Sequence, residues 1–394
     1  MPDPSPSFLP FAVPDLTEAE AEAVADVVRD GWINTGPRAK AFETEFAAAV
    51  GARHGVAVNS CTAALHVAYE AIGLRDGDEV LVPTMTFTST AATAWHLGAR
   101  PVLVDIREGD ETLDVEKAER AVTPRTKAIV PVHYGGQACE LDAILDLAKR
   151  KGLRVVEDAA HAFPASYKGR PIGTFGDVTC FSFYSTKTIT TAEGGMACTQ
   201  DDDLAARMRL MALHGISKDA WKRYTSEGSW YYEVLAPGYK YNLTDLAAAI
   251  GRVQLARAGD MLRRREAIAK RYLEAFGSND ALIVPTVLPD RTHAWHLFSL
   301  RLRLEALPLS RDAFLDELKA RGIGTSVHYI PLHLQPCYRE TFGFRPGDFP
   351  VAEDAYRRSV SLPIYSKMTD ADVDRVIDAV LDLVGKNRSS DTTG

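Results

Sequence analysis

The chain has 394 residues, of which 46% are hydrophobic and 25% charged, so a mostly disordered protein is excluded and two or three domains are expected. The 45 lysines and arginines are outnumbered by 53 aspartates and glutamates, and the net charge of −8 argues against a nucleic-acid partner. No apolar run approaches the roughly 20 residues of a membrane span, and the start MPDPSPS lacks the features of a signal peptide. Five scattered cysteines without a CxxC pair favour free thiols. We therefore expect a cytoplasmic protein without a membrane partner.

The first half of the chain alternates between predicted helices and strands. After a Pro-rich arm over residues 1–16, the segment Thr17-Glu18-Ala19-Glu20 forms a capping box and predicts a helix that ends at Gly31. Short apolar runs then predict strands at 55–59, 79–83, 101–106, 128–133 and 154–158. Helix-like segments lie between the strands, among them 62–72 and 141–151. This alternation indicates an α/β fold with a mainly parallel sheet.

The second half predicts a smaller unit of α+β type. After β-rich segments at 177–187 and 194–199, a long helix from Thr244 to about Phe276 is interpreted as the connector between two domains. The elements predicted beyond it are a strand at 295–304, a helix at 310–321, a β segment at 325–330 and a helix at 369–384. The predicted division is a large α/β domain over 10–255, a small C-terminal domain over 256–385 and a frayed tail over 386–394. The aperiodic stretch 217–237 predicts an excursion loop.

Two polar residues follow apolar strands and point to one cofactor. Asp158 ends the run RVVED at the strand edge where open α/β sheets gather ligands, although such an acid on its own is more often a turn former or helix cap. Lys187 lies 29 residues later among Ser, Thr and Gly and is a candidate Schiff-base former. Pyridoxal phosphate needs both groups, a lysine that binds its aldehyde and a carboxylate that keeps its pyridine nitrogen protonated. The sequence therefore predicts pyridoxal phosphate as cofactor.

A third feature, VNSCTAALHVA, passes from a strand directly into a helix. Helix N-termini present free N–H groups and a partial positive charge, so the amides of Thr62 and Ala63 are candidates for holding a phosphate. The alternative is that the residue before the helix acts only as an N-cap.

Seven segments together carry a family resemblance. They are, in chain order, GWINTGP, NSCTAALH, TMTFTSTA, VVEDAAHA, FSFYSTKTITTAEGG, GYKYNLTDLAAAIG and SVHYIPLH. From about Leu9 to Val384 the chain resembles the DegT/DnrJ/EryC1/StrS family of sugar aminotransferases. The segments GWINTGP, PVHYGG, GYKYNLTD, HAWHLF and RGIGT most resemble the branch that aminates a UDP-linked 4-keto-pentose for lipid A modification, with 4-keto-6-deoxyhexose aminotransferases close behind. The resemblance implies the pyridoxal-phosphate-dependent transferase fold type I, and a homodimer whose active sites lie at the subunit interface.

The resemblance also implies roles for residues around the cofactor. Lys187 would be the Schiff-base lysine and would move the proton, and Asp158 would pair with the pyridine nitrogen. His161 matches a residue near the ring hydroxyl, the alternative being a buried structural histidine. Phe87 matches the aromatic residue that stacks on the ring, the alternative being a core aromatic. Ser182 matches a phosphate-binding hydroxyl.

The segment GYKYNLTD matches a strand that reaches into the neighbouring subunit's site, and it departs from the commoner family pattern GYNYRMTD. Lys240 stands where many members have Asn, and Asn242 stands where they have Arg. Both are assigned to cofactor binding, since Lys240 can still meet phosphate as a point charge. The departure puts in doubt the donor-carboxylate role that the Arg has elsewhere in the family.

Substrate contacts follow from the same resemblance. An early loop matches the sugar pocket, and its residues are Trp32, Ile33, Asn34 and Thr35. A later segment faces it, with Val327, His328, Tyr329 and Ile330. Ordinary loop packing and strand alternation are the alternatives. His293 and His296 lack nearby acidic or Cys ligands, so no metal is expected.

The predicted function is transfer of an amino group from glutamate, which leaves as 2-oxoglutarate, to C4 of a nucleotide-linked keto-sugar for lipopolysaccharide or polysaccharide biosynthesis. Three alternatives are weighed against it. A sugar 3-dehydratase of the same family would carry His in place of Lys187. A cofactor-bound regulatory protein would keep the fold without turnover. A nicotinamide oxidoreductase would need a GxGxxG segment after a strand, which this chain lacks.

Overall fold

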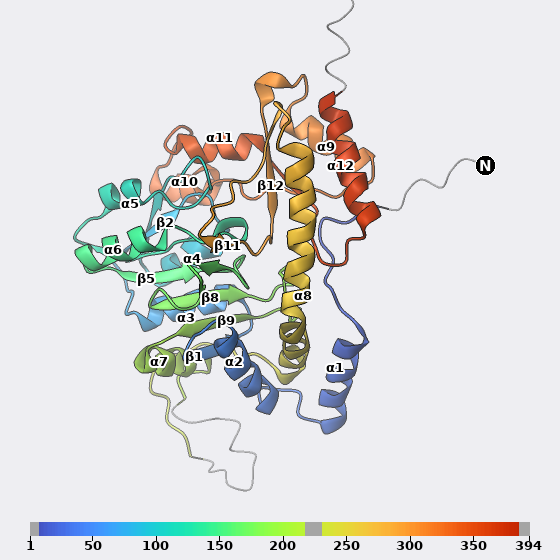
Figure 1. Ribbon diagram of the computed structural model, residues 1–394. Coiled ribbons are helices and arrows are strands. Elements are labelled where there is room, and N and C mark those ends of the chain that lie inside the picture. Colours follow the sequence, from blue (N-terminus) through green and yellow to red (C-terminus); the bar gives the residue numbers. More distant parts are fainter. Residues whose placement is uncertain (1–7, 217–230, 386–394) are drawn as a thin grey trace, which may run out of the picture.

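The computed structural model describes residues 8–216 and 231–385 (Figure 1). The predicted tail 386–394, most of the predicted loop 217–237 and residues 1–7 of the N-terminal arm lie outside these ranges. Two buried cores are joined by the long helix α8 (Asp245–Phe276), which runs beside both units in Figure 1. Within the described ranges, no helix has both the length and the apolarity that crossing a membrane requires.

The large unit contains a seven-stranded sheet in the order β1-β9-β8-β5-β4-β2-β3. Its strands are β1 (His54–Val58), β2 (Glu79–Pro83), β3 (Arg100–Val104), β4 (Thr126–Ile129), β5 (Arg154–Asp158), β8 (Val178–Ser182) and β9 (Gly195–Thr199). Of these seven, β9 runs antiparallel to both neighbours, while the pairs that connect β8, β5, β4, β2 and β3 are parallel. The predicted mainly parallel sheet is confirmed. Because parallel strands end at one edge, Asp158 and Ser182 lie at the same edge of the sheet.

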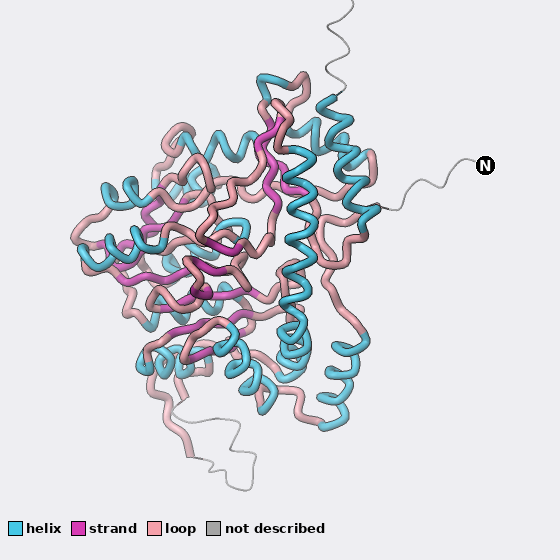
Figure 2. Tube along the Cα trace, in the orientation of Figure 1, coloured by secondary structure: helices cyan, strands magenta, loops and turns pink. Residues whose placement is uncertain are grey.

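Helices cover both faces of this sheet (Figure 2). After α1 (Glu18–Asp30), they are α2 (Pro37–Ala49), α3 (Cys61–Ala71), α4 (Ser89–His96), α5 (Val115–Ala121), α6 (Leu141–Lys151) and α7 (Asp202–Ala212). Successive strand residues point to opposite faces, so Val80 and Val82 join the core cluster of α3 while Leu81 joins the cluster of α5 and α6. Burial on both faces explains why the strands read as continuous apolar runs.

The elements after α8 form the smaller unit and its link to the large one. They are β10 (Leu282–Ile283), β11 (Arg291–Thr292), β12 (Phe298–Leu302), α9 (Arg311–Ala320), α10 (Pro336–Phe342), α11 (Pro350–Arg358), β13 (Ser359–Leu362) and α12 (Asp370–Gly385). A three-stranded antiparallel sheet has the order β10-β12-β13. Strand β11 instead pairs with β6 (Ser166–Tyr167), which pairs with β7 (Arg170–Pro171). This second small sheet ties the two halves of the chain together.

Helix α8 contributes to both cores. Its residues Ala258 and Met261 are buried with the large unit, whereas Ile268 and Tyr272 are buried with the smaller one. Leu9, from the N-terminal arm, is also buried in the core of the smaller unit. The change of core therefore lies between 261 and 268, and the predicted division after residue 255 falls inside one continuous helix.

Two segments predicted as strands do not form strands. The segment 325–330 makes a single bridge, from Ser326 to Ser361. In the segment that matches GYKYNLTD, Lys240 and Asn242 make isolated bridges only. A strand must pair with a neighbouring strand over several consecutive residues, and each of these segments pairs with another part of the chain at isolated residues only.

Candidate active site

A cavity of about 420 Å³ opens at the carboxyl edge of the parallel strands, where β5 and β8 end. Its lining comes from both units and consists of Phe11, Ser60, Cys61, Thr62, Phe87, Ser89, Asp158, Ala160, His161, Ser182, Tyr184, Thr186, Lys187, Glu193, Gly194, His296, Ser326, His328 and Tyr329. The structure thus brings together the residues predicted to face the cofactor ring with two of those predicted to face the sugar.

Asp158 is the last residue of β5 and is 4% exposed. Its Oδ2 accepts a hydrogen bond from the Thr90 hydroxyl at 2.6 Å, and its Oδ1 accepts one from the Ala160 amide at 3.1 Å. Burial raises the pKa of the Asp158 carboxyl, and the two hydrogen bonds oppose that rise because they favour the charged form. The site therefore holds one oriented carboxyl group in a poorly solvated place.

Thr90 is a residue that sequence reasoning missed. It lies in α4, in the segment TMTFTSTA that was considered only for Phe87. Its carbonyl accepts a hydrogen bond from the Tyr69 hydroxyl at 2.8 Å, and its hydroxyl lies 2.8 Å from Thr86 Oγ1. Hydroxyl residues at the start of a helix are commonly caps, so the sequence carried no signal that this one holds Asp158.

Lys187 lies in the connection between β8 and β9 and is partly buried. Its backbone amide donates to the Tyr184 carbonyl at 2.9 Å, and its Nζ lies 3.2 Å from His296 Nε2. Burial lowers the pKa of Lys187 to about 8, although negative charge on Cys61 and Asp158 would raise it. An amine with such a pKa is neutral in a far larger fraction near physiological pH than an ordinary lysine, and the neutral form is the one that acts as a nucleophile or a base.

His296 is the second residue that sequence reasoning missed, because it was weighed only with His293 as a metal pair. The structure separates the two. His293 Nδ1 accepts a hydrogen bond from the Trp295 amide at 2.8 Å, whereas the His296 ring faces Lys187. The described residues contain no group of three or more His, Cys, Asp or Glu side chains that could hold a metal ion.

His161 joins the two units across the cavity. Its Nδ1 accepts a hydrogen bond from the Gly135 amide at 3.3 Å, and its Nε2 lies 2.9 Å from the hydroxyl of Tyr329. Because Nδ1 accepts, the neutral ring carries its proton on Nε2 and donates to Tyr329. Burial lowers the pKa of His161 well below its usual range, so the ring is neutral at pH 7. It is a buried histidine with both nitrogens engaged, and it also lines the cavity.

The N-terminus of α3 meets the cavity. The Ser60 side chain caps the helix by accepting a hydrogen bond from the Ala63 amide at 3.0 Å, which is the N-cap alternative, and the phosphate contacts of Thr62 and Ala63 stay predictions. Cys61 and Thr62, in the same first turn, line the cavity. A Cβ on Gly195 would lie 2.5 Å from the Ser60 carbonyl, so glycine there lets β9 pass directly beneath the helix end.

Two further predicted residues line the cavity. Phe87 is 56% exposed, which rules out the alternative of a core aromatic and leaves a ring face open to the cavity. Ser182 ends β8 and is half-buried, and its hydroxyl accepts the Tyr184 amide at 3.4 Å.

The predicted sugar loop, residues 32–35, does not line this cavity, and neither does Lys240 or Asn242. The loop and the 240–245 segment instead bind each other. The Thr35 hydroxyl donates to the Leu243 carbonyl at 2.5 Å, and Asn242 Nδ2 donates to Thr35 Oγ1 at 2.5 Å. Within one chain, the lining of the cavity does not include Trp32, Ile33, Asn34, Thr35, Lys240 or Asn242, and their assignment to substrate and cofactor binding stays a prediction.

Asp245 fixes that loop by capping a helix to which it does not belong. Its Oδ1 accepts the amides of Gly36 at 2.8 Å and Ala39 at 2.9 Å, and its Oδ2 accepts the Arg38 amide at 3.1 Å. Its own amide donates to the Asn34 carbonyl at 2.9 Å. The first turn of α2, which starts from a glycine without a capping side chain, is thus satisfied by a carboxylate from α8.

Backbone pairing at the turn of PVHYGG places His296. The Ala294 amide donates to the Gly136 carbonyl at 2.9 Å, and the Leu297 amide donates to the Gly135 carbonyl at 3.1 Å. Gly136 has φ 109°, and a Cβ there would lie 3.0 Å from two backbone atoms. Only glycine fits this position without strain.

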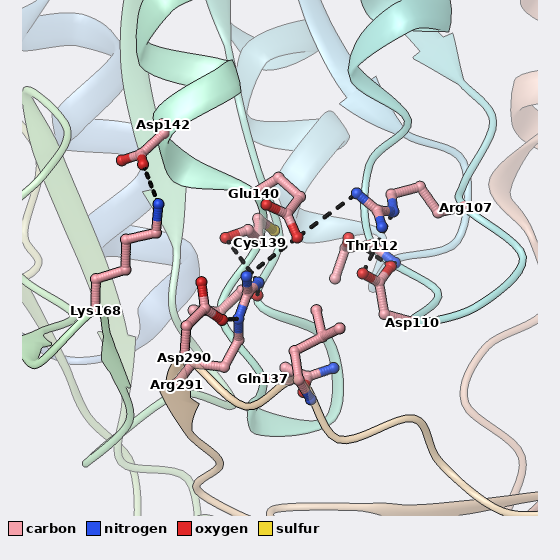
Figure 3. Close-up of polar contacts among 12 residues, drawn as sticks. Arg107, Asp110, Thr112, Gln137, Cys139, Glu140, Asp142, Lys168, Asp290 and Arg291 are labelled. Carbon is pink, nitrogen blue, oxygen red and sulfur yellow. Dashed lines mark hydrogen bonds and ion pairs between the residues drawn. The ribbon is translucent and has the colours of Figure 1, made fainter.

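A buried guanidinium holds the chain just before His296 (Figure 3). The Arg291 side chain, 2% exposed, donates to the carbonyl of Ala138 at 2.7 Å, to Glu140 Oε1 at 3.1 Å and to Asp290 Oδ1 at 2.8 Å. On the other side of Glu140, Arg107 Nη1 lies 3.6 Å from the same carboxylate oxygen, Oε1. These contacts of Arg291 attach the segment before His296, which links the two units, to the residues at the start of α6.

The donor set fits the cofactor that the sequence predicts. One cavity contains an amine with a lowered pKa, a buried carboxyl group, an exposed aromatic side chain and the first turn of a helix directly over Gly195. These are the groups needed by an aldehyde, a ring nitrogen, a flat ring and a phosphate, respectively.

Comparisons with known proteins agree with this geometry. The chain is 52% identical over 378 residues to the spore coat polysaccharide biosynthesis protein SpsC of Bacillus subtilis, covering 96% of this chain and 97% of SpsC. It is 50% identical over 382 residues to protein MJ1066 of Methanocaldococcus jannaschii, covering 97% and 99% of the two chains. Spr1654 of Streptococcus pneumoniae, named as a sugar aminotransferase and solved in its PMP-form, superposes with a TM-score of 0.90 at 34% identity, covering 96% and 99%.

The family pattern itself matches residues 14–381. A match of that length, with relatives half identical along nearly all of their sequence, shows that the chain belongs to the DegT/DnrJ/EryC1/StrS aminotransferase family.

Proposed function

We propose that this sugar aminotransferase moves an amino group from glutamate to C4 of a nucleotide-linked keto-sugar, and that it does so in the cytoplasm. The observation that carries the proposal is that the Lys187 amine and the Asp158 carboxylate line one cavity together with the N-terminus of α3. SpsC is named for polysaccharide biosynthesis, which supports a product used in a polysaccharide or lipopolysaccharide.

The cofactor is pyridoxal phosphate, as the sequence predicts and as in the PLP-form of Spr1654. Lys187 would hold its aldehyde carbon and Asp158 its pyridine nitrogen, and Ser182 with the first turn of α3 would hold its phosphate. When bound, the cofactor supplies an electron sink for the electrons released from a substrate C–H bond.

Protons in the site are handled by groups of the chain itself. With a pKa of about 8, roughly half of the Lys187 amines are neutral at pH 8, so the amine can take a proton from substrate carbon and return it. Asp158, held by the Thr90 hydroxyl, would pair with the pyridine nitrogen of the cofactor and favour its protonated form. His161 is neutral and donates to Tyr329, so it contributes a hydrogen bond and no charge.

The sugar would enter between the two units. His328 and Tyr329 line the cavity from the smaller unit, across from Asp158 of the large one. The His328 ring is held at Nδ1 by Ser361 Oγ at 2.9 Å, and its carbonyl accepts a hydrogen bond from the Tyr134 hydroxyl. Groups fixed in this way suit recognition of a polyhydroxylated ligand.

A homodimer with shared sites would account for the predicted residues that do not line the cavity of their own chain. The loop 32–35 and the 240–245 segment form one rigid patch, in which Ile33 is 46% exposed and Lys240 is exposed. We propose that the patch of one subunit completes the cavity of the other.

Absorbance separates the proposal from its alternatives. The protein purified with cofactor should absorb near ~420 nm, and glutamate should shift the band to shorter wavelength. Lys187→Ala should abolish the band, whereas Lys168→Ala, a surface lysine paired with Asp142, should keep it. A colourless protein, or full amine exchange by the Lys187 variant, would contradict the assignment.

The aminated products that the enzyme forms from a panel of nucleotide-linked keto-sugars would identify its substrate. The enzyme should be assayed with glutamate against UDP-, dTDP- and GDP-linked 4-keto-sugars and a 3-keto-sugar, with the aminated carbon located by NMR. Amination at C4 supports the proposal, and amination only at C3 overturns the position. A normal absorbance band without amination of any sugar would favour the regulatory protein instead.

A further inference from the structure

His296 is held firmly beside Lys187. It is 6% exposed and lies between β11 and β12, where backbone pairing with Gly135 and Gly136 places its ring in the cavity lining. Its Nε2 is 3.2 Å from Lys187 Nζ. This is a side-chain contact between two units across 109 residues of sequence.

The lysine has no carboxylate partner at ion-pair distance among the described residues, so the imidazole is its polar contact. Titratable and charged groups face Lys187 from each surrounding element: Cys61 of α3, Asp158 of β5, Arg265 of α8, and the rings of His161 and His328. None of them hydrogen-bonds Nζ within the described part of the chain. The orientation of the Lys187 amine therefore depends on one hydrogen-bond acceptor, His296 Nε2.

The imidazole can serve as that acceptor. Burial lowers the pKa of His296 well below its usual range, as do the positive charge of Lys187 and the neighbouring His161 ring, whose centroid is 4.4 Å away. A neutral ring has one acceptor nitrogen. Its Nδ1 is buried and has no hydrogen-bond partner among the residues that the structure describes, an unfavourable state for a histidine with a purely structural role.

We propose that His296 is a positioning residue for Lys187: its Nε2 accepts a hydrogen bond from the amine and fixes the direction from which the amine attacks. The inference rests on the proposed role of Lys187 as the lysine that carries the cofactor. Loss of this hydrogen bond should leave the amine present but misdirected, and it should also remove an acceptor that favours the charged form.

The test measures capture of pyridoxal phosphate by the full-length apoprotein, without any turnover. The neutral amine adds to the aldehyde carbon and water leaves, and borohydride then supplies the hydride that reduces the C=N bond to a stable secondary amine. Mass spectrometry locates and quantifies the adduct on Lys187 over time between pH 6 and 10. The variants are His296→Phe, which keeps the ring size, and His296→Gln, whose amide can accept a hydrogen bond at the position of Nε2. His293→Phe, a buried ring without contact to Lys187, is the matched control.

His296→Phe should lower the plateau rate of capture about tenfold, the loss of about one hydrogen bond, and should move the pH midpoint downward. His296→Gln should restore the rate to within about threefold of the wild type. His293→Phe should change neither quantity, whatever it does to thermal stability. A wild-type rate and midpoint in His296→Phe would overturn the inference, as would a His296→Gln variant no better than the Phe variant. Capture away from Lys187, or undiminished in Lys187→Ala, would instead refute the proposed function.

Discussion

Replacing Asp245 tests whether one buried carboxylate holds the first turn of another helix. The side chain is 0% exposed and accepts three backbone amides, those of Gly36, Arg38 and Ala39. Alanine at this position leaves these donors without a partner, and the two bound to Oδ1 are buried. Each unsatisfied buried donor costs about 1–3 kcal/mol, so we expect Asp245→Ala to lower the free energy of unfolding by about 2–6 kcal/mol.

The asparagine variant separates the cap from the charge. In Asp245→Asn, the side-chain carbonyl oxygen can still accept the two buried amides, while the NH₂ group faces the Arg38 amide and cannot accept it. Asp245→Asn should therefore cost about 1–2 kcal/mol, clearly less than alanine. Thr244→Ala, which removes the ordinary cap of α8 at the Ala247 amide, is the neighbouring control and should cost about 1 kcal/mol.

Urea unfolding followed by circular dichroism at one fixed protein concentration gives these differences, since a dimer would make stability depend on concentration. The reasoning is refuted if Asp245→Ala costs less than about 1 kcal/mol, or if the alanine and asparagine variants are equal.

Three other predictions follow from the site and its supports. Thr90→Val removes the hydroxyl that donates a hydrogen bond to the Asp158 carboxylate. Burial already raises the pKa of Asp158, so the variant should lower the free energy of unfolding in urea more at pH 8 than at pH 5, by up to about 3 kcal/mol. An equal loss of stability at both pH values would contradict this role of Thr90. Gly136→Ala should lower stability by about 1–3 kcal/mol, since φ is 109° and a Cβ would meet backbone at 3.0 Å; an unchanged Tm would show that the turn relaxes freely. If the proposed shared site is right, Lys240→Ala should weaken cofactor retention in dialysis and lower activity without changing the elution volume in size-exclusion chromatography. Full retention of the cofactor would contradict a role of Lys240 in that site.

Local patterns predicted most of the elements, because each depends on residues close together in the chain. The capping box at Thr17 is present with both of its hydrogen bonds, and α6 occupies 141–151 as predicted. Helix α8 begins after the cap Thr244 and ends at Phe276, as its long apolar periodicity indicates. Two predicted strands are absent: the segment 325–330, and the segment GYKYNLTD (238–245), which was expected as a strand from the family resemblance; both make isolated bridges only.

Only some of the site residues could be predicted from the sequence, namely those that stand out within their own short segment. Asp158 stands out as a polar residue that ends a buried strand, and Lys187 stands out in the polar connection that follows the next strand of the sheet. Parallel strands end at one edge of a sheet, so both residues were expected near that edge. The functional roles given to them, and to His161, Phe87 and Ser182, stay predictions that the cavity geometry supports. Thr90 could not be found, because its hydroxyl reaches Asp158 across 68 residues of sequence.

The sequence by itself thus determined the alternation of helices and strands, the family and the cofactor, all of which are set by local periodicity and short segments. Only the tertiary structure decided that His296 faces Lys187 and that the loop 32–35 is held by Asp245 away from the cavity of its own chain. The first contact joins residues 109 positions apart and the second joins residues 209 positions apart, and no short stretch of residues encodes either one.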